Sequence, residues 1–205
     1  MGNKGERTRA DIVRKSAALM NRQGFMAATM ASVVEATGIQ KGGLYRHFES
    51  REALAYEALD FAVSQVRARF AQVLEGKTNA CERLLAMLDA YDDADGADVP
   101  LAGGCPIMNT AIESDHAHPG LRERAQAAMD GWHGLLRRIV AAGLRSGEIR
   151  PGVEPARVAS VFIACVEGAV MLSQLHGDTS YLKVAREHLK RHVETELRPL
   201  PEEPS

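Results

Sequence analysis

The segment at residues 29–54 constrains the fold most, because its capping residues and glycines define two short helices joined by a tight turn. Thr29 suits the N-cap of a helix over residues 30–37, and Gly38 suits the left-handed position that ends it. A second short helix is expected over residues 41–47. Ser50 then caps a longer helix that extends to about residue 74. The segment therefore predicts a helix-turn-helix.

Two helices this short need a third helix to bury their apolar side chains. The spacing of apolar residues predicts that helix over residues 8–23, ended by Gly24. The expected small core consists of Ile12, Leu19, Met20, Phe25, Val33, Val34, Ile39, Leu44 and Phe48.

The rest of the chain predicts helices as well. Helix-forming residues dominate, and aromatic residues make up only 5% of the sequence. Further helices are expected over residues 80–91, 107–114, 120–146, 155–176 and 180–197, with an Asp-, Gly- and Pro-rich loop at 92–106. The prediction is an all-α fold of about nine helices. It has a helix-turn-helix domain at 1–52, a helical domain at 53–198 and a disordered tail at 199–205.

Charge is distributed unevenly along the chain. Residues 1–51 contain nine Lys and Arg against four Asp and Glu, a net charge of +5. The whole chain carries −2, which leaves −7 for the remainder. This asymmetry favours a basic, anion-binding N-terminal part joined to an acidic body.

The second short helix carries groups suited to duplex DNA. In a helix-turn-helix this second helix lies in the major groove. Lys41 and Arg46 can neutralise phosphates or reach guanine, and Tyr45 and His47 can donate to phosphate oxygens. Arg51, at the start of the next helix, can hold a flanking phosphate.

Two adjacent glycines, Gly42 and Gly43, stand near the start of this helix. Each is unfavourable in a helix by about 1 kcal/mol, so the pair suggests either a frayed turn or a backbone that a ligand approaches closely. Backbone N–H groups exposed in this way could bind a phosphate. A packed turn with no ligand is the alternative interpretation.

Residues 8–54 resemble the DNA-binding region of the TetR family of bacterial transcriptional regulators. The matching positions are Ile12, Gly24, Phe25, Thr29, Val33, Gly38, Ile39, Lys41, Gly42, Leu44, Tyr45, His47, Phe48 and residues 50–54. The resemblance implies a homodimer on a near-palindromic operator, released when a small molecule binds the C-terminal body. It further implies phosphate contacts from Thr29, Lys41, Tyr45, His47 and Arg51.

The chain departs from the family pattern at four of these or neighbouring positions. They are Ser16, Gln40, Gly43 and Arg51. Gln40 and Gly43 lie beside the recognition helix, so they could alter the preferred operator.

The body offers one candidate sensor and one candidate ligand site. Cys105 precedes Pro106 near a helix start, where a thiolate is stabilised, and similar stretches in the resembled family include electrophile or oxidant sensors. A small buried side chain is the alternative reading. Trp132 and His133 either line a ligand pocket or pack in the core. Cys81 is expected to be inert, and Cys165 to lie in the core.

The last two long helices are expected to form a dimer contact, because residues 158–175 are apolar on almost every side. The longest apolar run, residues 158–166, is too short to span a bilayer, and no signal peptide is recognised. These observations predict a cytoplasmic protein without a membrane partner.

The sequence leaves three other interpretations to consider. Cys105 with His116 or His118 could serve an α-helical enzyme, but no spaced triad or cofactor motif supports one. Residues 115–118, which include Asp115, His116 and His118, are read as a solvated connection before Pro119, because the segment does not have the ligand spacing of a metal site, so neither metal nor cofactor is predicted. A constitutive DNA-binding protein without an effector is the main alternative to a ligand-responsive repressor.

Overall fold

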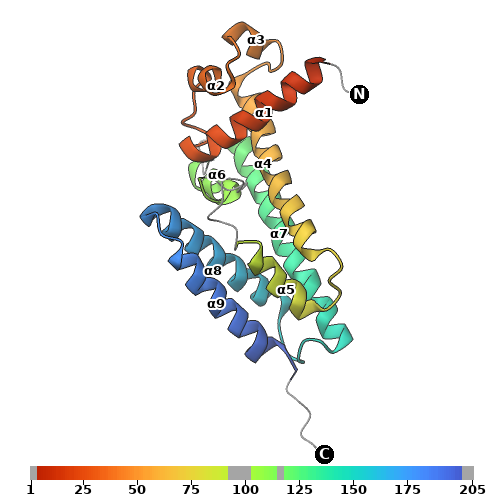
Figure 1. The fold of residues 1–205 in the computed structure, drawn as a ribbon. Helices are drawn as coiled ribbons and strands as arrows, with labels where there is room; N and C mark the ends of the chain where they lie inside the picture. Colours follow the sequence, from red (N-terminus) through yellow and green to blue (C-terminus); the bar gives the residue numbers. More distant parts are fainter. Residues whose placement is uncertain (1–3, 92–102, 115–117, 200–205) are drawn as a thin grey trace, which may run out of the picture. The chain divides into compact units, whose positions relative to one another are not determined.

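A computed structural model describes residues 4–91, 103–114 and 118–199. Within these residues every regular element is helical, which confirms the all-α prediction. The elements are α1 (Lys4–Gln23), α2 (Met30–Thr37), α3 (Lys41–Tyr45), α4 (Arg51–Leu74), α5 (Ala80–Asp89), α6 (Pro106–Ser114), α7 (Pro119–Ser146), α8 (Pro155–His176), α9 (Ser180–His192) and a π-helical turn, η2 (Val193–Leu197) (Figure 1).

The chain divides into two compact units. The first comprises Met1–Arg67 with Asp98–Ala128, and the second comprises Ala68–Ala97 with Met129–Ser205. The long helices α4 and α7 therefore contribute residues to both. A domain boundary after residue 52 stays a prediction. The predicted tail at 199–205 lies almost wholly outside the described residues.

In the first unit, α1, α2 and α3 close over a small apolar core. Ile12 and Met20 of α1, Phe25, Val33 of α2 and Leu44 of α3 are all fully buried. Burying five large side chains accounts for much of the stability of such short helices, which would be marginal alone. This core contains most of the residues that the sequence predicted for it.

Several helices differ in length from the prediction: α1 begins at Lys4 instead of residue 8, and α5 ends at Asp89 instead of residue 91. The helix α3 ends at Tyr45, two residues early, and the amides of His47 and Phe48 both donate to the Leu44 carbonyl in a tightened last turn. The last helix changes at Val193 into the wider π turn, where the Arg198 amide donates to the Val193 carbonyl.

In the second unit, α5, α8, α9, η2 and the later part of α7 share a core. The helices α8 and α9 lie side by side and run in opposite directions (Figure 1). Gly143 of α7 permits a close approach to α5, because a side chain there would come within 2.5 Å of the Ala80 methyl group. The first amide of α5, that of Ala80, donates to the Glu148 carboxylate at 2.7 Å.

The helix α8 is long and apolar enough, by length and composition alone, to cross a membrane. Its longest apolar run, residues 158–166, is too short to span a bilayer, which is why the sequence did not predict a membrane segment here. Helices of protein cores pass the same test, and Val158, Phe162, Val166 and Val170 of α8 are buried within this unit. One such helix is weak support for a membrane segment.

Candidate nucleic-acid interface

The turn between α2 and α3 is fixed by local hydrogen bonds. Gly38 adopts φ of +73°, which favours glycine, and its amide donates to the Val34 carbonyl at 2.8 Å. The Thr37 hydroxyl donates to the Val33 carbonyl at 2.7 Å and accepts from the Ile39 amide at 3.3 Å. The direction in which α3 leaves the turn is therefore set by α2.

The inner side of α3 is anchored on the core and on α1. Leu44 is fully buried, and Phe48, just beyond the helix, is nearly so. The Arg9 guanidinium of α1 lies 4.8 Å from the centre of the Phe48 ring and pairs with Glu57 at 2.5 Å. These contacts leave α3 with one inward and one outward side.

The outward side carries the predicted DNA-binding groups. Lys41, Gly42, Tyr45 and Arg46 are exposed, and His47 is half-buried. Tyr45 is 46% exposed. The outward side of α3 and its C-cap residue Arg46 thus expose two cations and a phenol.

The two adjacent glycines differ in what surrounds them. A side chain at Gly42 would meet nothing within 4 Å, so this position is open to a ligand. At Gly43 a side chain would come within 2.8 Å of the Ile39 methyl group, so its small size serves packing. Gln40 is exposed and forms no side-chain hydrogen bond that caps the helix.

Thr29 forms the N-cap of α2, as predicted, within a reciprocal capping box. Its hydroxyl accepts from the Ser32 amide at 3.2 Å, and its own amide donates to the Ser32 hydroxyl at 3.0 Å. The partner is a serine where Glu or Gln is usual, so the sequence pattern for this box was absent. Thr29 remains exposed, and its phosphate contact stays a prediction.

Arg51 has a structural role that sequence reasoning missed. Its guanidinium donates to the carbonyls of Ala28 at 2.5 Å, of Met26 at 2.6 Å and of Phe25. These carbonyls belong to the loop between α1 and α2. The Nη1 group forms none of these hydrogen bonds, so it can still donate to a phosphate. That phosphate contact stays a prediction for Arg51.

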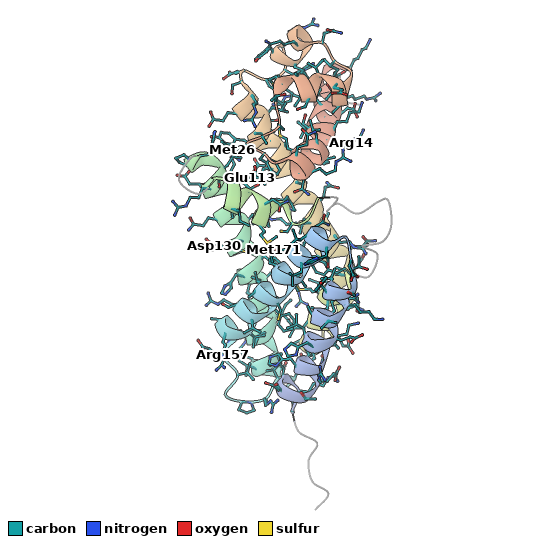
Figure 2. The ribbon with its side chains drawn as sticks, turned by 90° about the vertical axis from the view of Figure 1, so that its left-hand side faces the viewer. Arg14, Met26, Glu113, Asp130, Arg157 and Met171 are labelled. Atoms are coloured by element: carbon teal, nitrogen blue, oxygen red, sulfur yellow. The ribbon has the colours of Figure 1, made fainter. Side chains whose placement is uncertain are left out.

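Glu113 of α6 holds the same loop from a second element, and nothing in the sequence indicated it. Its Oε2 atom accepts from the Met26 amide at 3.0 Å, and Figure 2 shows the two residues side by side. The contact joins positions 87 residues apart, so no local pattern could reveal it.

The three cysteines have different surroundings. Cys105 is buried, and its carbonyl accepts from the Asn109 amide in the first turn of α6. Burial raises the pKa of the Cys81 thiol, which donates to the Glu148 carbonyl. Cys165 is half-buried on α8, which corrects the expectation that it lies in the core. The error arose because an apolar helix sequence does not show which of its sides the same chain covers.

Trp132 and His133 point to different neighbours, as adjacent residues on a helix must. Trp132 stacks on Phe70 with ring centres 5.7 Å apart, and its indole N–H has no hydrogen-bond partner within the described part of the chain. The His133 Nε2 atom lies 3.1 Å from the Ser160 hydroxyl on α8. The two do not form one cluster.

No group of three metal-ligating side chains occurs among residues 4–91, 103–114 and 118–199. His116, which entered the enzyme and metal interpretations, lies outside these residues. His118 lies 3.4 Å from Glu52, not beside Cys105 in any contact that the structure records.

Comparisons with known proteins agree with this geometry. A family profile described as "Bacterial regulatory proteins, tetR family" matches residues 12–58, and one described as "Tetracyclin repressor-like, C-terminal domain" matches residues 80–189. Among curated proteins, the HTH-type transcriptional repressor DhaR of Mycobacterium sp. (strain GP1) is 24% identical over 165 residues, covering 80% of each chain.

Two solved structures match almost the whole chain. A TetR transcriptional regulator from Chloroflexus aurantiacus is 43% identical with a TM-score of 0.90, and the match covers 96% of this chain and 99% of that one. A TetR-family regulator from Cytophaga hutchinsonii is 31% identical with a TM-score of 0.89, covering 98% and 100%. These relatives are regulators and not enzymes, and the chain described here belongs to the TetR family of bacterial transcriptional regulators.

Proposed function

We propose that this regulator is a ligand-responsive repressor that binds a near-palindromic operator as a homodimer and is released by a small molecule or an electrophile. Repressors are named among its relatives, which supports the direction of control. The observation that carries the DNA-binding part is the outward side of α3, where Lys41, Tyr45 and Arg46 are exposed above a buried Leu44.

The direct test is an electrophoretic mobility shift with the DNA that flanks the gene. We expect a specific shift that unlabelled random-sequence duplex does not compete away at equal concentration. A shift reversed by a metabolite would support a ligand-responsive regulator. Specific binding that no metabolite or oxidant alters would favour the constitutive alternative, and no specific shift would contradict both.

The roles proposed for the contact residues separate affinity from specificity. Lys41 and Tyr45 would contact phosphates, as would Thr29, His47 and Arg51, whereas Arg46 would read a base edge. Gln40 and Gly43 would influence which operator sequence is preferred. Gly42, near the start of α3, would let the backbone approach the DNA closely. Loss of a phosphate contact should weaken binding to all sequences, but loss of Arg46 should relax the preference at one base pair.

The homodimer would form through α8 and α9. The outward side of α8 carries Val161 (40% exposed), Met171 (44%) and Leu175 (72%), and α9 adds Val184 (65%). On α8 these residues, with Ala164 and Gly168 between them, repeat at alternating spacings of three and four, which suits a partner helix. A second copy offers the same stripe, so one patch can cover the other around a two-fold axis.

Trp132 supports an effector site in the second unit. A buried indole N–H without a partner costs free energy, on the order of 1–3 kcal/mol, unless a ligand or water accepts from it. Trp132 is the only tryptophan, so its fluorescence reports on this site alone. Titration with a candidate aromatic or carbonyl-bearing effector should shift the emission and weaken DNA binding at the same concentration. His133, on the surface toward α8, would contribute only indirectly.

A second release route would use Cys105 as an electrophile or redox sensor. Its burial requires α6 to open before a reagent can reach the sulfur, so the more exposed Cys165 should react first. Mass spectrometry after mild N-ethylmaleimide treatment would rank the sites. An unmodified Cys105 with unchanged DNA affinity would contradict this route.

A cytoplasmic location fits a regulator that binds chromosomal DNA.

A further inference from the structure

The loop between α1 and α2 is held from two directions within the first unit. Arg51, at the start of α4, donates hydrogen bonds to the loop carbonyls of Phe25, Met26 and Ala28. The carboxylate of Glu113, near the end of α6, accepts a hydrogen bond from the Met26 amide at 3.0 Å. One charged side chain thus binds the acceptors of this loop while the other binds a donor.

Gly24 makes the approach of Glu113 possible. A side chain at Gly24 would come within 2.8 Å of the Glu113 Oε2 atom, and the residue has φ of +102°, which favours glycine. Any larger residue would both strain the backbone and push the carboxylate away from the Met26 amide.

The other end of α6 is joined to α1 by a buried amide network. The Asn21 side chain donates to the Gly104 carbonyl at 2.9 Å. The Asn109 side chain donates to the Gly103 carbonyl at 2.8 Å and to the Asn21 Oδ1 atom at 3.2 Å. Gly103 lies so close to α1 that a side chain there would come within 2.6 Å of the Asn21 carbonyl oxygen.

We propose that residues 103–114 position the DNA-binding head, which is the part of the chain formed by α1, α2 and α3. Glu113 and the Asn21–Asn109 pair hold the α1–α2 loop in the geometry that presents α3 to DNA. None of these residues lies on α3, and Glu113 would repel a phosphate if it came near one. Their effect on DNA binding must therefore pass through the loop and through α2, which begins at Met30 directly after the loop.

The physical reason is preorganisation. A loop whose carbonyls are held by Arg51 and whose Met26 amide is held by Glu113 loses little conformational entropy when DNA binds. A loop held by Arg51 alone must become ordered on binding, which costs conformational entropy. The affinity of the head should thus depend on whether α6 is docked, even when every DNA-contacting side chain is unchanged.

The first experiment compares Glu113→Ala with the charge-matched control Glu123→Gln in the full-length protein. Glu123 is an exposed residue of the same unit. Simple electrostatics predicts that losing either carboxylate tightens binding to a DNA duplex, because one repulsion is removed. The positioning role predicts the opposite for Glu113→Ala, with affinity about tenfold weaker, as expected for losing a charge-assisted hydrogen bond. The slope of affinity against salt should not fall, since no phosphate contact is lost.

The second experiment measures hydrogen exchange at the Met26 amide and requires no DNA. Exchange should accelerate in Glu113→Ala and stay at the wild-type rate in Glu123→Gln. Asn109→Ala should weaken DNA binding in the same direction by a smaller factor, about threefold, because its hydrogen bonds are between neutral groups. Thermal unfolding of each variant checks that the fold is retained.

Gly103→Ala tests the close approach, with Gly76→Ala as its match. Both glycines have positive φ, but a side chain at Gly76 would meet nothing within 4 Å. Gly76→Ala should lose stability through its positive φ alone, whereas Gly103→Ala should lose more, because its φ of +102° is less favourable and its side chain would meet the backbone of α1. Only Gly103→Ala should weaken DNA binding. Unchanged or tighter binding in Glu113→Ala, or unchanged Met26 exchange, would overturn the proposal. Absence of DNA binding by the wild-type protein, with Met26 exchange behaving as expected, would count against the proposed function instead.

Discussion

The helices α3 and α8 both expose side chains to solvent, but they expose opposite kinds. The helix α3 presents Lys41, Tyr45 and Arg46, whereas α8 presents Val161, Met171 and Leu175. A polar, cationic side suits the phosphates and base edges of DNA, and an apolar side with three–four spacing suits another helix. The same chain therefore carries two surfaces whose partners can be told apart by chemistry alone.

The largest effect should come from placing a charge on the apolar surface of α8. Met171→Glu would bring two carboxylates together in the proposed dimer, so we expect a monomer in analytical ultracentrifugation. Operator affinity should fall about 100-fold, because the two half-sites would no longer be bound together. Met171→Leu is the control and should stay dimeric. A dimeric Met171→Glu variant with normal affinity would remove α8 from the interface.

Arg51→Ala should have the next largest effect, because it removes the hydrogen bonds that one guanidinium donates to the α1–α2 loop. The free energy of unfolding should fall by about 2 kcal/mol. Arg51→Lys should recover little of it, since an ammonium group cannot reproduce the planar fork. Chemical denaturation measures both. Full stability in Arg51→Ala would show that these hydrogen bonds contribute nothing net.

Lys41→Ala and Tyr45→Ala act on the polar surface and should leave stability unchanged. Affinity should fall for every DNA sequence, and for Lys41 the slope of log affinity against log salt should decrease by about 0.9. Arg46→Ala should instead reduce discrimination at one base pair, by about 1–3 kcal/mol. Fluorescence anisotropy over a salt series separates them. A uniform loss in all three variants would show that the division between phosphate and base contacts is wrong.

The smallest effect concerns Gly168, in the middle of the α8 stripe. A side chain there would meet nothing within 4 Å in the single chain, so Gly168→Ala should stabilise an isolated α8 by up to about 1 kcal/mol. If a second copy crosses close to this position, the same change should weaken the dimer instead. Sedimentation equilibrium gives the sign, and a stronger dimer would place the crossing elsewhere.

Much of the DNA-binding head could be predicted because its signals are local. Thr29 and Gly38 directly flank the eight residues of α2, and Leu44 and Phe48 identify the buried side of α3. Glu113 could not be predicted, because its partner Met26 is 87 residues away and neither residue belongs to a motif. Cys165 was placed in the core because an apolar helix does not reveal whether its own chain or a second chain covers it.

The most direct test of the central claim compares the wild-type protein with the triple variant Lys41→Ala, Tyr45→Ala and Arg46→Ala on DNA flanking the gene. We predict that the variant folds and dimerises like the wild type, because all three side chains are exposed and none contributes to the core. We also predict that its specific binding is lost. Wild-type affinity and sequence preference in that variant would contradict the assignment of α3 as the DNA-recognition helix.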